Sequence, residues 1–91
     1  MAARTKRSKL VRAVGRRIAE LRRAKHWTQE QFAAEAEVLI GYVRRVEGGY
    51  ENLSLESLEK IAALLDVDVI ALLKPPVEAE VRRGRPRQKQ L

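Results

Sequence analysis

The chain has 91 residues, which fits one domain, and its low aromatic content of 4% indicates a core built from Leu, Ile, Val and Ala. The absence of Cys excludes disulfides and thiolate metal sites, and no apolar run approaches the length of a membrane span or follows the basic N-terminus as in a signal peptide. The net charge of +7 favours a polyanionic partner, and we expect a cytoplasmic protein.

The basic residues concentrate toward the two ends of the chain. Residues 1–25 carry ten basic side chains and one acidic one, and residues 77–91 carry five and two. Residues 26–76 carry four basic and nine acidic side chains. Because counterion release by basic side chains supplies much of the affinity for duplex DNA, binding to DNA would depend on the two ends. Plain solvated charge is the alternative.

Residues 1–9 are small, polar and basic without periodicity, so we expect a mobile arm there. A helix over about 9–25 follows, with Ser8 as its cap. Gly15 in its interior costs about 1 kcal/mol relative to Ala, which a close contact with another helix would explain. The apolar face of this helix is formed by Leu10, Val14, Ile18 and Leu21.

Two short helices joined by a turn of about three residues are predicted between residues 28 and 47. Thr28 is a good N-cap, Gln31 completes a capping box, and Trp27 can pack on Phe32 as a hydrophobic staple. Phe32, Ala33 and Ala36 form the apolar stripe of the first helix, and Val43 and Val46 that of the second. Val38 lies between them as the expected buried turn residue. This pattern is typical of a helix-turn-helix. Three side chains of the second helix fall on faces not needed for burial, which suits the DNA major groove: Tyr42, Arg44 and Arg45.

A loop is predicted at residues 48–52, because paired Gly is a usual stop signal for a helix. Ser54 then caps a further helix, and Asp68 caps a last short helix over 69–73. The apolar stripe of the longer helix is Leu55, Leu58, Ile61, Ala62 and Leu65. Five helices and no strand are therefore expected, an all-α fold.

Residues 12 to 74 resemble the lambda-repressor/Cro-like, or XRE, family of helix-turn-helix regulators. The resemblance rests on LRRAKHWTQEQFA, VRRVE and NLSLESLEKIAALLDV. The NLSLESL segment is most similar to the controller proteins of restriction-modification systems. The resemblance to the family implies a compact lambda-repressor-like DNA-binding domain at 10–74. A basic arm at 1–9 precedes this domain, and a disordered basic tail at 75–91 follows it.

The chain departs from that family in the turn between the two helices. Relatives usually have Gly, Val and then Ser or Thr, where this chain has Glu37, Val38 and Leu39. Because Gly supplies a left-handed backbone there, we expect Glu37 to carry about 1 kcal/mol of strain. Leu39 is likewise a poor N-cap for the helix that follows.

The resemblance also implies roles for single residues. Gln29 matches a glutamine that touches the DNA backbone, and Arg22 with Glu47 matches a pair that ties the first helix to the recognition helix. Arg45, and after it Arg44, are the expected guanine contacts. The expected DNA-contacting residues are Thr28, Gln29, Leu39, Ile40, Gly41, Tyr42, Arg44, Arg45, Tyr50, Asn52, Arg83 and Arg85.

Two groups of these residues keep alternatives open. Leu39 and Ile40 either contact thymine methyl groups, or pack inward, or meet a protein. In the tail, Arg83-Gly84-Arg85-Pro86 resembles the core of an AT-hook, whose arginines lie along the minor groove of A·T-rich DNA. A plain solvated tail is the alternative.

A domain of this size cannot easily bury all the apolar residues near its C-terminal end, so we expect a homodimer through the last two helices. The expected interface residues are Leu64, Leu65, Ile70, Leu72 and Leu73. A two-fold dimer predicts a palindromic operator with half-sites about one DNA turn apart.

The sequence therefore favours a sequence-specific transcriptional regulator of double-stranded DNA, such as a repressor or controller protein. The alternatives are an antitoxin or other protein-partnered regulator, and a non-specific nucleoid-like protein. We expect no enzyme, cofactor or metal site. His26 has no second ligand at metal spacing, and no Gly-rich phosphate loop opens a helix. Clustered carboxylates fit solvated helix faces: Glu56, Glu59, Asp66 and Asp68.

Overall fold

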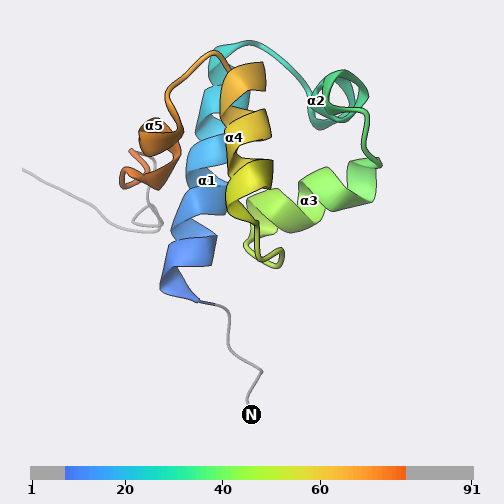
Figure 1. Cartoon of the computed structure of the whole chain (residues 1–91). Helices are drawn as coiled ribbons and strands as arrows, with labels where there is room; N and C mark the ends of the chain where they lie inside the picture. The colour runs from blue at the N-terminus through green and yellow to red at the C-terminus, as the bar shows by residue number, and fades with distance from the viewer. Residues whose placement is uncertain (1–7, 78–91) are drawn as a thin grey trace, which may run out of the picture.

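Five α-helices make up the part of the chain that the structure, a computed structural model, describes, which is residues 8–77 (Figure 1). They are α1 (Lys9–Ala24), α2 (Gln29–Ala36), α3 (Ile40–Gly48), α4 (Leu55–Leu64) and α5 (Val69–Leu73). No strand occurs within residues 8–77, so the all-α, five-helix prediction is confirmed. No helix in this range is long and apolar enough to cross a membrane.

Short polar side chains begin four of the helices, as predicted. Ser8, Ser54 and Asp68 each accept a hydrogen bond from a backbone N–H in the first turn of α1, α4 and α5. At α2, Thr28 Oγ1 accepts from the Gln31 N–H at 3.0 Å, and the Gln31 side chain accepts from the Thr28 N–H at 2.8 Å. This completes the capping box. Each such cap stabilises its helix by about 1 kcal/mol.

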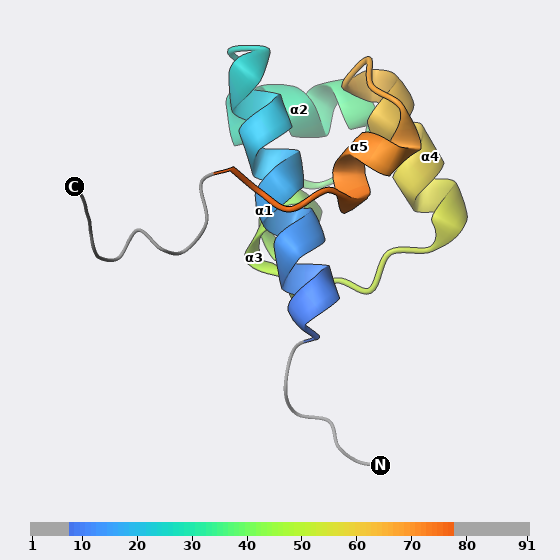
Figure 2. The ribbon, with the colours of Figure 1, turned by 90° about the vertical axis from the view of Figure 1, so that its left-hand side faces the viewer.

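Helix α1 contacts α3 and α5, while α2 packs against α3 and α4 (Figures 1 and 2). The expected staple is present, since the rings of Trp27 and Phe32 stack with their centroids 6.0 Å apart. The buried core that the helices share consists of Val14, Ile18, Phe32, Ala33, Val43, Val46, Leu58, Ile61, Ala62, Leu65 and Leu72.

Glycines allow the backbones of α1 and α3 to touch. A Cβ atom at Gly15 would overlap the carbonyl oxygen of Val46 in α3, closer than any side chain permits. Gly49, the C-cap of α3, has a φ of +81°, and a Cβ there would lie 2.9 Å from the Cα of Arg12. The close helix contact expected at Gly15 is thus confirmed, and α3 is its partner.

Several burial predictions were wrong for positional reasons. Leu10 is 60% exposed because it lies in the first turn of α1, at an open groove that it lines with residues 51–53, Leu58 and Leu73. Leu55, 80% exposed, is the first residue of α4 and precedes the turn that covers the core. Val38 is 36% exposed because it lines an open groove between the turn and α4 rather than the core. Tyr42, expected on a free face, is half-buried against the core, and Gly48 lies within α3 rather than in the loop.

The turn between α2 and α3 has the predicted backbone. Glu37 is left-handed, with φ 60° and ψ 44°, and its N–H closes α2 by donating to the carbonyl of Ala34. Leu39 occupies the N-cap of α3 without a side-chain hydrogen bond. An L-residue in this conformation costs about 1 kcal/mol more than Gly.

We therefore expect Glu37→Gly to raise the free energy of unfolding by about 1 kcal/mol, because Gly adopts the left-handed conformation without strain. Urea denaturation measures this change. The matched control is Glu35→Gly within α2, which removes the same charge and should lower stability by about 1 kcal/mol. A denaturation midpoint for Glu37→Gly at or below that of the parent chain would contradict the strain.

Candidate nucleic-acid interface

The pair formed by Arg22 and Glu47 fixes α3 against α1. Arg22 Nε donates to Glu47 Oε2 at 2.6 Å and Arg22 Nη2 donates to Oε1 at 3.0 Å, a bidentate geometry. The two side chains are only 10% and 7% exposed. Arg22 Nη1 also donates to the carbonyl of Trp27 at 2.8 Å. The expected structural role of this pair is confirmed, and Arg22 is not free to read DNA.

Gln29 joins the same network at the start of α2. Its Nε2 donates to Glu47 Oε1 at 2.9 Å. This contact holds the side chain at the N-terminus of α2, where backbone N–H groups without helical partners favour an anion. Thr28, the N-cap, is exposed beside it. Their role as phosphate contacts stays a prediction.

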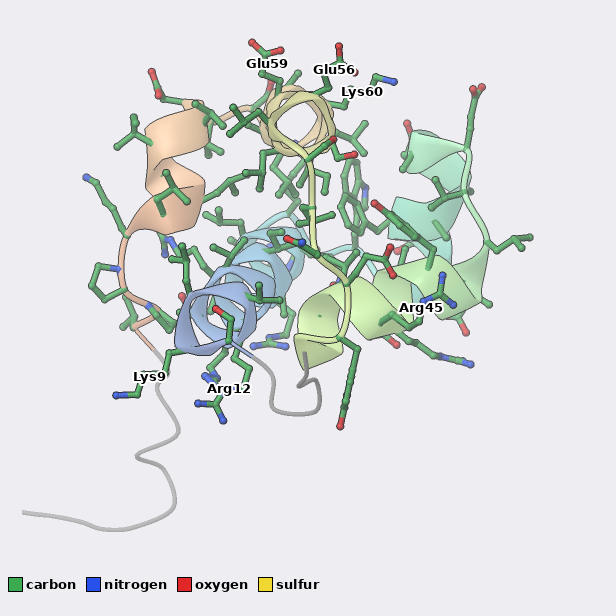
Figure 3. The ribbon with its side chains drawn as sticks, turned by 60° about the horizontal axis from the view of Figure 1, so that its bottom comes forward. Lys9, Arg12, Arg45, Glu56, Glu59 and Lys60 are labelled. Carbon is green, nitrogen blue, oxygen red and sulfur yellow. The ribbon has the colours of Figure 1, made fainter. Side chains whose placement is uncertain are left out.

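Arg45 lies along the exposed side of α3 (Figure 3). Its Nε donates to Glu51 Oε1 at 3.1 Å, and its Cζ stands 5.9 Å from the centre of the Tyr42 ring. A Cβ at Gly41 would lie 3.7 Å from Arg45 Nη1, so the side chain extends back over the first turn of α3. The side chain is 55% exposed. Glu51 as its partner was missed by the sequence reasoning.

The other expected contacts differ in accessibility. Leu39 is 82% exposed and does not pack inward, whereas Ile40 is half-buried against the core. The side chains of Arg44, Tyr50 and Asn52 are exposed. A protein contact and a thymine methyl contact both stay open for Leu39. Arg83 and Arg85 lie outside the described residues.

The basic start of α1 lies beside the C-terminal end of α3. The Cγ atom of Arg12 would be 2.7 Å from a Cβ at Gly49, which places the aliphatic stem of Arg12 against the C-cap of α3. Lys9 and Arg12 extend from one side of the molecule, while Glu56 and Glu59 of α4 extend from the opposite side (Figure 3). The start of α1 thus brings positive charge to the side of the molecule opposite Glu56 and Glu59.

The residues expected at a dimer interface divide in two. Leu65 and Leu72 are 3% and 0% exposed, because the junction of α4 and α5 uses them in the core of a single chain. They are not free to meet a second copy. Ile70 and Leu73 are exposed and Leu64 is half-buried, so a dimer proposal rests on these three.

Arg17, which the sequence reasoning did not single out, attaches α5 to α1. Its Nε donates to the carbonyl of Ala71 at 2.9 Å, and its Nη1 pairs with Glu20 at 3.2 Å. Glu20 in turn accepts from the Val77 N–H. Among residues 8–77 no group of three His, Asp or Glu side chains stands close enough to hold a metal ion.

A helix-turn-helix family model, HTH_3, matches residues 18–72. The transcriptional regulator SinR of Bacillus subtilis (strain 168) is 35% identical over 68 residues, which cover 74% of this chain and 61% of SinR. The chain thus spans less than two thirds of this curated relative.

Solved structures agree with that match. The restriction-modification controller protein C.AhdI from Aeromonas hydrophila has a TM-score of 0.64 and 37% identity, over 68% of this chain and 94% of C.AhdI. SinR in complex with DNA has a TM-score of 0.62 and 35% identity, over 67% of this chain and 98% of that one. The hypothetical transcription factor NHTF from Neisseria has a TM-score of 0.70 and 28% identity, over 91% and 98%.

The Arg22–Glu47 pair yields a stability prediction. Glu47→Ala leaves the buried Arg22 guanidinium without its carboxylate and should lower the free energy of unfolding by about 3 kcal/mol. Chemical denaturation measures the change, with Glu59→Ala on the exposed side of α4 as the charge-matched control, expected within about 0.5 kcal/mol of the parent. Equal effects of the two substitutions would show that the pair does not hold α3.

Proposed function

The chain belongs to the helix-turn-helix (HTH_3) family, and from this premise we propose that it is a sequence-specific, double-stranded DNA-binding transcriptional regulator that acts as a homodimer on a palindromic operator. The matches confirm the sequence-based resemblance to XRE-type regulators, including restriction-modification controller proteins. These relatives are DNA-binding regulators rather than enzymes, and we propose no catalytic role.

The observation that carries the proposal is that one face of α3 is packed against the rest of the domain while another face is exposed. Val43 and Val46 are buried and Glu47 is bound by Arg22 on one face. Arg45 stands half-exposed on another. A rigid helix with an exposed arginine suits the major groove, where a guanidinium binds O6 and N7 of guanine with two hydrogen bonds.

Surrounding groups support binding to the phosphate backbone. The N-terminus of α2, with Thr28 and Gln29, offers N–H groups to an anion, as helix N-termini do. Exposed Tyr50 and Asn52 follow α3, and Lys9 and Arg12 carry positive charge at the start of α1. Such contacts fix the register of a protein on DNA without reading sequence.

The proposed dimer uses the apolar surface that remains on α4 and α5. Ile70 is 56% exposed and Leu73 is 44% exposed, with half-buried Leu64 in the preceding helix. A second copy of the chain would bury these apolar residues. The two-fold symmetry of such a dimer would set the half-sites on DNA about 34 Å apart. Cytoplasmic localisation and a minor-groove role for Arg83 and Arg85 belong to the same proposal.

One observation favours a second candidate, a regulator whose helix-turn-helix meets a protein, as in an antitoxin. Leu39 is an apolar side chain that is 82% exposed at the start of α3 and makes no capping hydrogen bond. A protein partner would bury it as readily as a thymine methyl group. A non-specific nucleoid-like protein is the weaker alternative. Binding to DNA from its own promoter in competition with random duplex separates a sequence-specific regulator from a nucleoid-like protein, which binds random duplex equally well.

Arg45→Ala should weaken binding to the cognate site by about 1 to 3 kcal/mol and relax the preference at one base pair in each half-site. Competition binding with cognate and random duplex measures both effects. Lys60→Ala on α4 is the control, because it removes the same charge from the side of the molecule that carries Glu56 and Glu59 (Figure 3). An equal loss on both duplexes would reduce Arg45 to a phosphate contact, and a parent chain without preference would refute specific recognition.

Ile70→Glu should weaken dimer formation by about 100-fold or more, since an unpaired carboxylate at a closed contact costs several kcal/mol. Sedimentation equilibrium measures the dissociation constant. The control is Leu39→Glu, which places the same charge on another exposed apolar residue, at the start of α3. The proposed interface is wrong if Ile70→Glu keeps the mass of the parent, and it lies elsewhere if Leu39→Glu is the variant that dissociates.

A further inference from the structure

We propose that Glu51 is a positioning residue for base reading, which holds Arg45 in the orientation for its base pair and weakens binding to all other duplexes. This inference rests on the proposed function. It adds to that function a residue that does not itself contact a base edge.

The contacts of Arg45 leave its outer edge to DNA. Glu51 Oε1 accepts from Nε at 3.1 Å, and the Tyr42 ring lies near Cζ on another side. A guanidinium has five N–H donors in a fixed plane, and the contact with Glu51 uses the one nearest the aliphatic stem. The two terminal Nη groups therefore remain for O6 and N7 of one guanine.

The end of α3 fixes where Glu51 stands. Gly49 adopts a left-handed conformation and donates to the carbonyl of Val46 at 3.1 Å, and the Tyr50 N–H donates to the carbonyl of Arg45 at 2.8 Å. These bonds reverse the chain, so that the residue after Tyr50 returns alongside Arg45. The contact of Gly49 with Arg12 attaches the reversed chain to α1. The pairing of Glu51 with Arg45 thus follows from a restrained backbone.

The charge of Glu51 affects binding to cognate and to random duplexes differently. Its side chain is 32% exposed, so its carboxylate repels the phosphates of any duplex that approaches α3. On the cognate site Arg45 keeps Glu51 as its partner and gains a guanine, whereas on a random duplex no guanine contact offsets this repulsion. Exposed ion pairs contribute little to folding stability, so the effect of Glu51 falls on the choice of DNA.

The test is Glu51→Gln, which keeps the size of the side chain and removes its charge. We expect the ratio of cognate to random affinity to fall about tenfold, part of the discrimination that one bidentate contact provides. Binding to random duplex should tighten, with a salt slope steeper by up to about 0.9 units. The thermal midpoint should stay that of the parent. Glu59→Gln, which removes a carboxylate from α4 on a separate part of the surface (Figure 3), should change neither affinity.

A double-substitution cycle shows whether Glu51 acts through Arg45. In an Arg45→Ala background, Glu51→Gln should leave the cognate-to-random ratio unchanged. If Glu51→Gln alters both affinities by the same factor in both backgrounds, Glu51 contributes charge alone and the inference is overturned. If the parent chain prefers the cognate duplex and Glu51→Gln keeps the same preference, the inference is overturned and the proposed function stands. A parent chain that does not discriminate refutes the proposed function itself.

Discussion

The close approach of α1 to α3 is the constraint on which the rest of the structure depends. At one point it is steric, because the backbone of α3 lies where a side chain at Gly15 would be. At another it is electrostatic, because Arg22 binds Glu47 through two hydrogen bonds in a nearly buried site. A steric contact sets the distance between the helices, and a bidentate pair sets their rotation. The outward face of α3 is consequently fixed by Gly15, Arg22 and Glu47 rather than by its own exposed side chains.

Recognition benefits from this separation of roles. Because the inward positions and the Arg22 pair hold α3, the side chains on its outer surface carry little of the folding energy. Arg45 and Leu39 can therefore serve a partner, and Leu39 can be apolar and exposed without harm to the core. A helix that is already fixed loses less entropy on binding. The contact between Arg45 and Glu51 restrains the Arg45 side chain in the same way.

The helix caps and the turn, which depend on residues close in the sequence, could be predicted. The burial of Leu10 and Leu72, which depends on residues distant in the sequence, could not. The caps at Ser8 and Thr28 and the left-handed Glu37 were predictable, because each is decided within a few residues. Burial depends on which helix covers a position. The apolar stripe therefore grouped Leu10 with buried residues, although Leu10 lies at an open groove and is 60% exposed. The surplus of apolar residues in the last two helices assigned Leu72 to a dimer interface, although α5 buries it in the core of one chain. The pairing of Glu51 crosses a helix end, where no periodicity applies; an acidic residue soon after paired Gly was the only local signal.

The central claim is that a rigid α3 selects a DNA sequence through Arg45. Enrichment of bound duplexes from a random pool, followed by sequencing, tests this claim without an assumed operator sequence. The account predicts an inverted repeat with centres about 10 base pairs apart and a guanine in each half-site whose enrichment disappears with the Arg45→Ala protein. A pool without an enriched motif, or a motif that the Arg45→Ala protein selects unchanged, would contradict it.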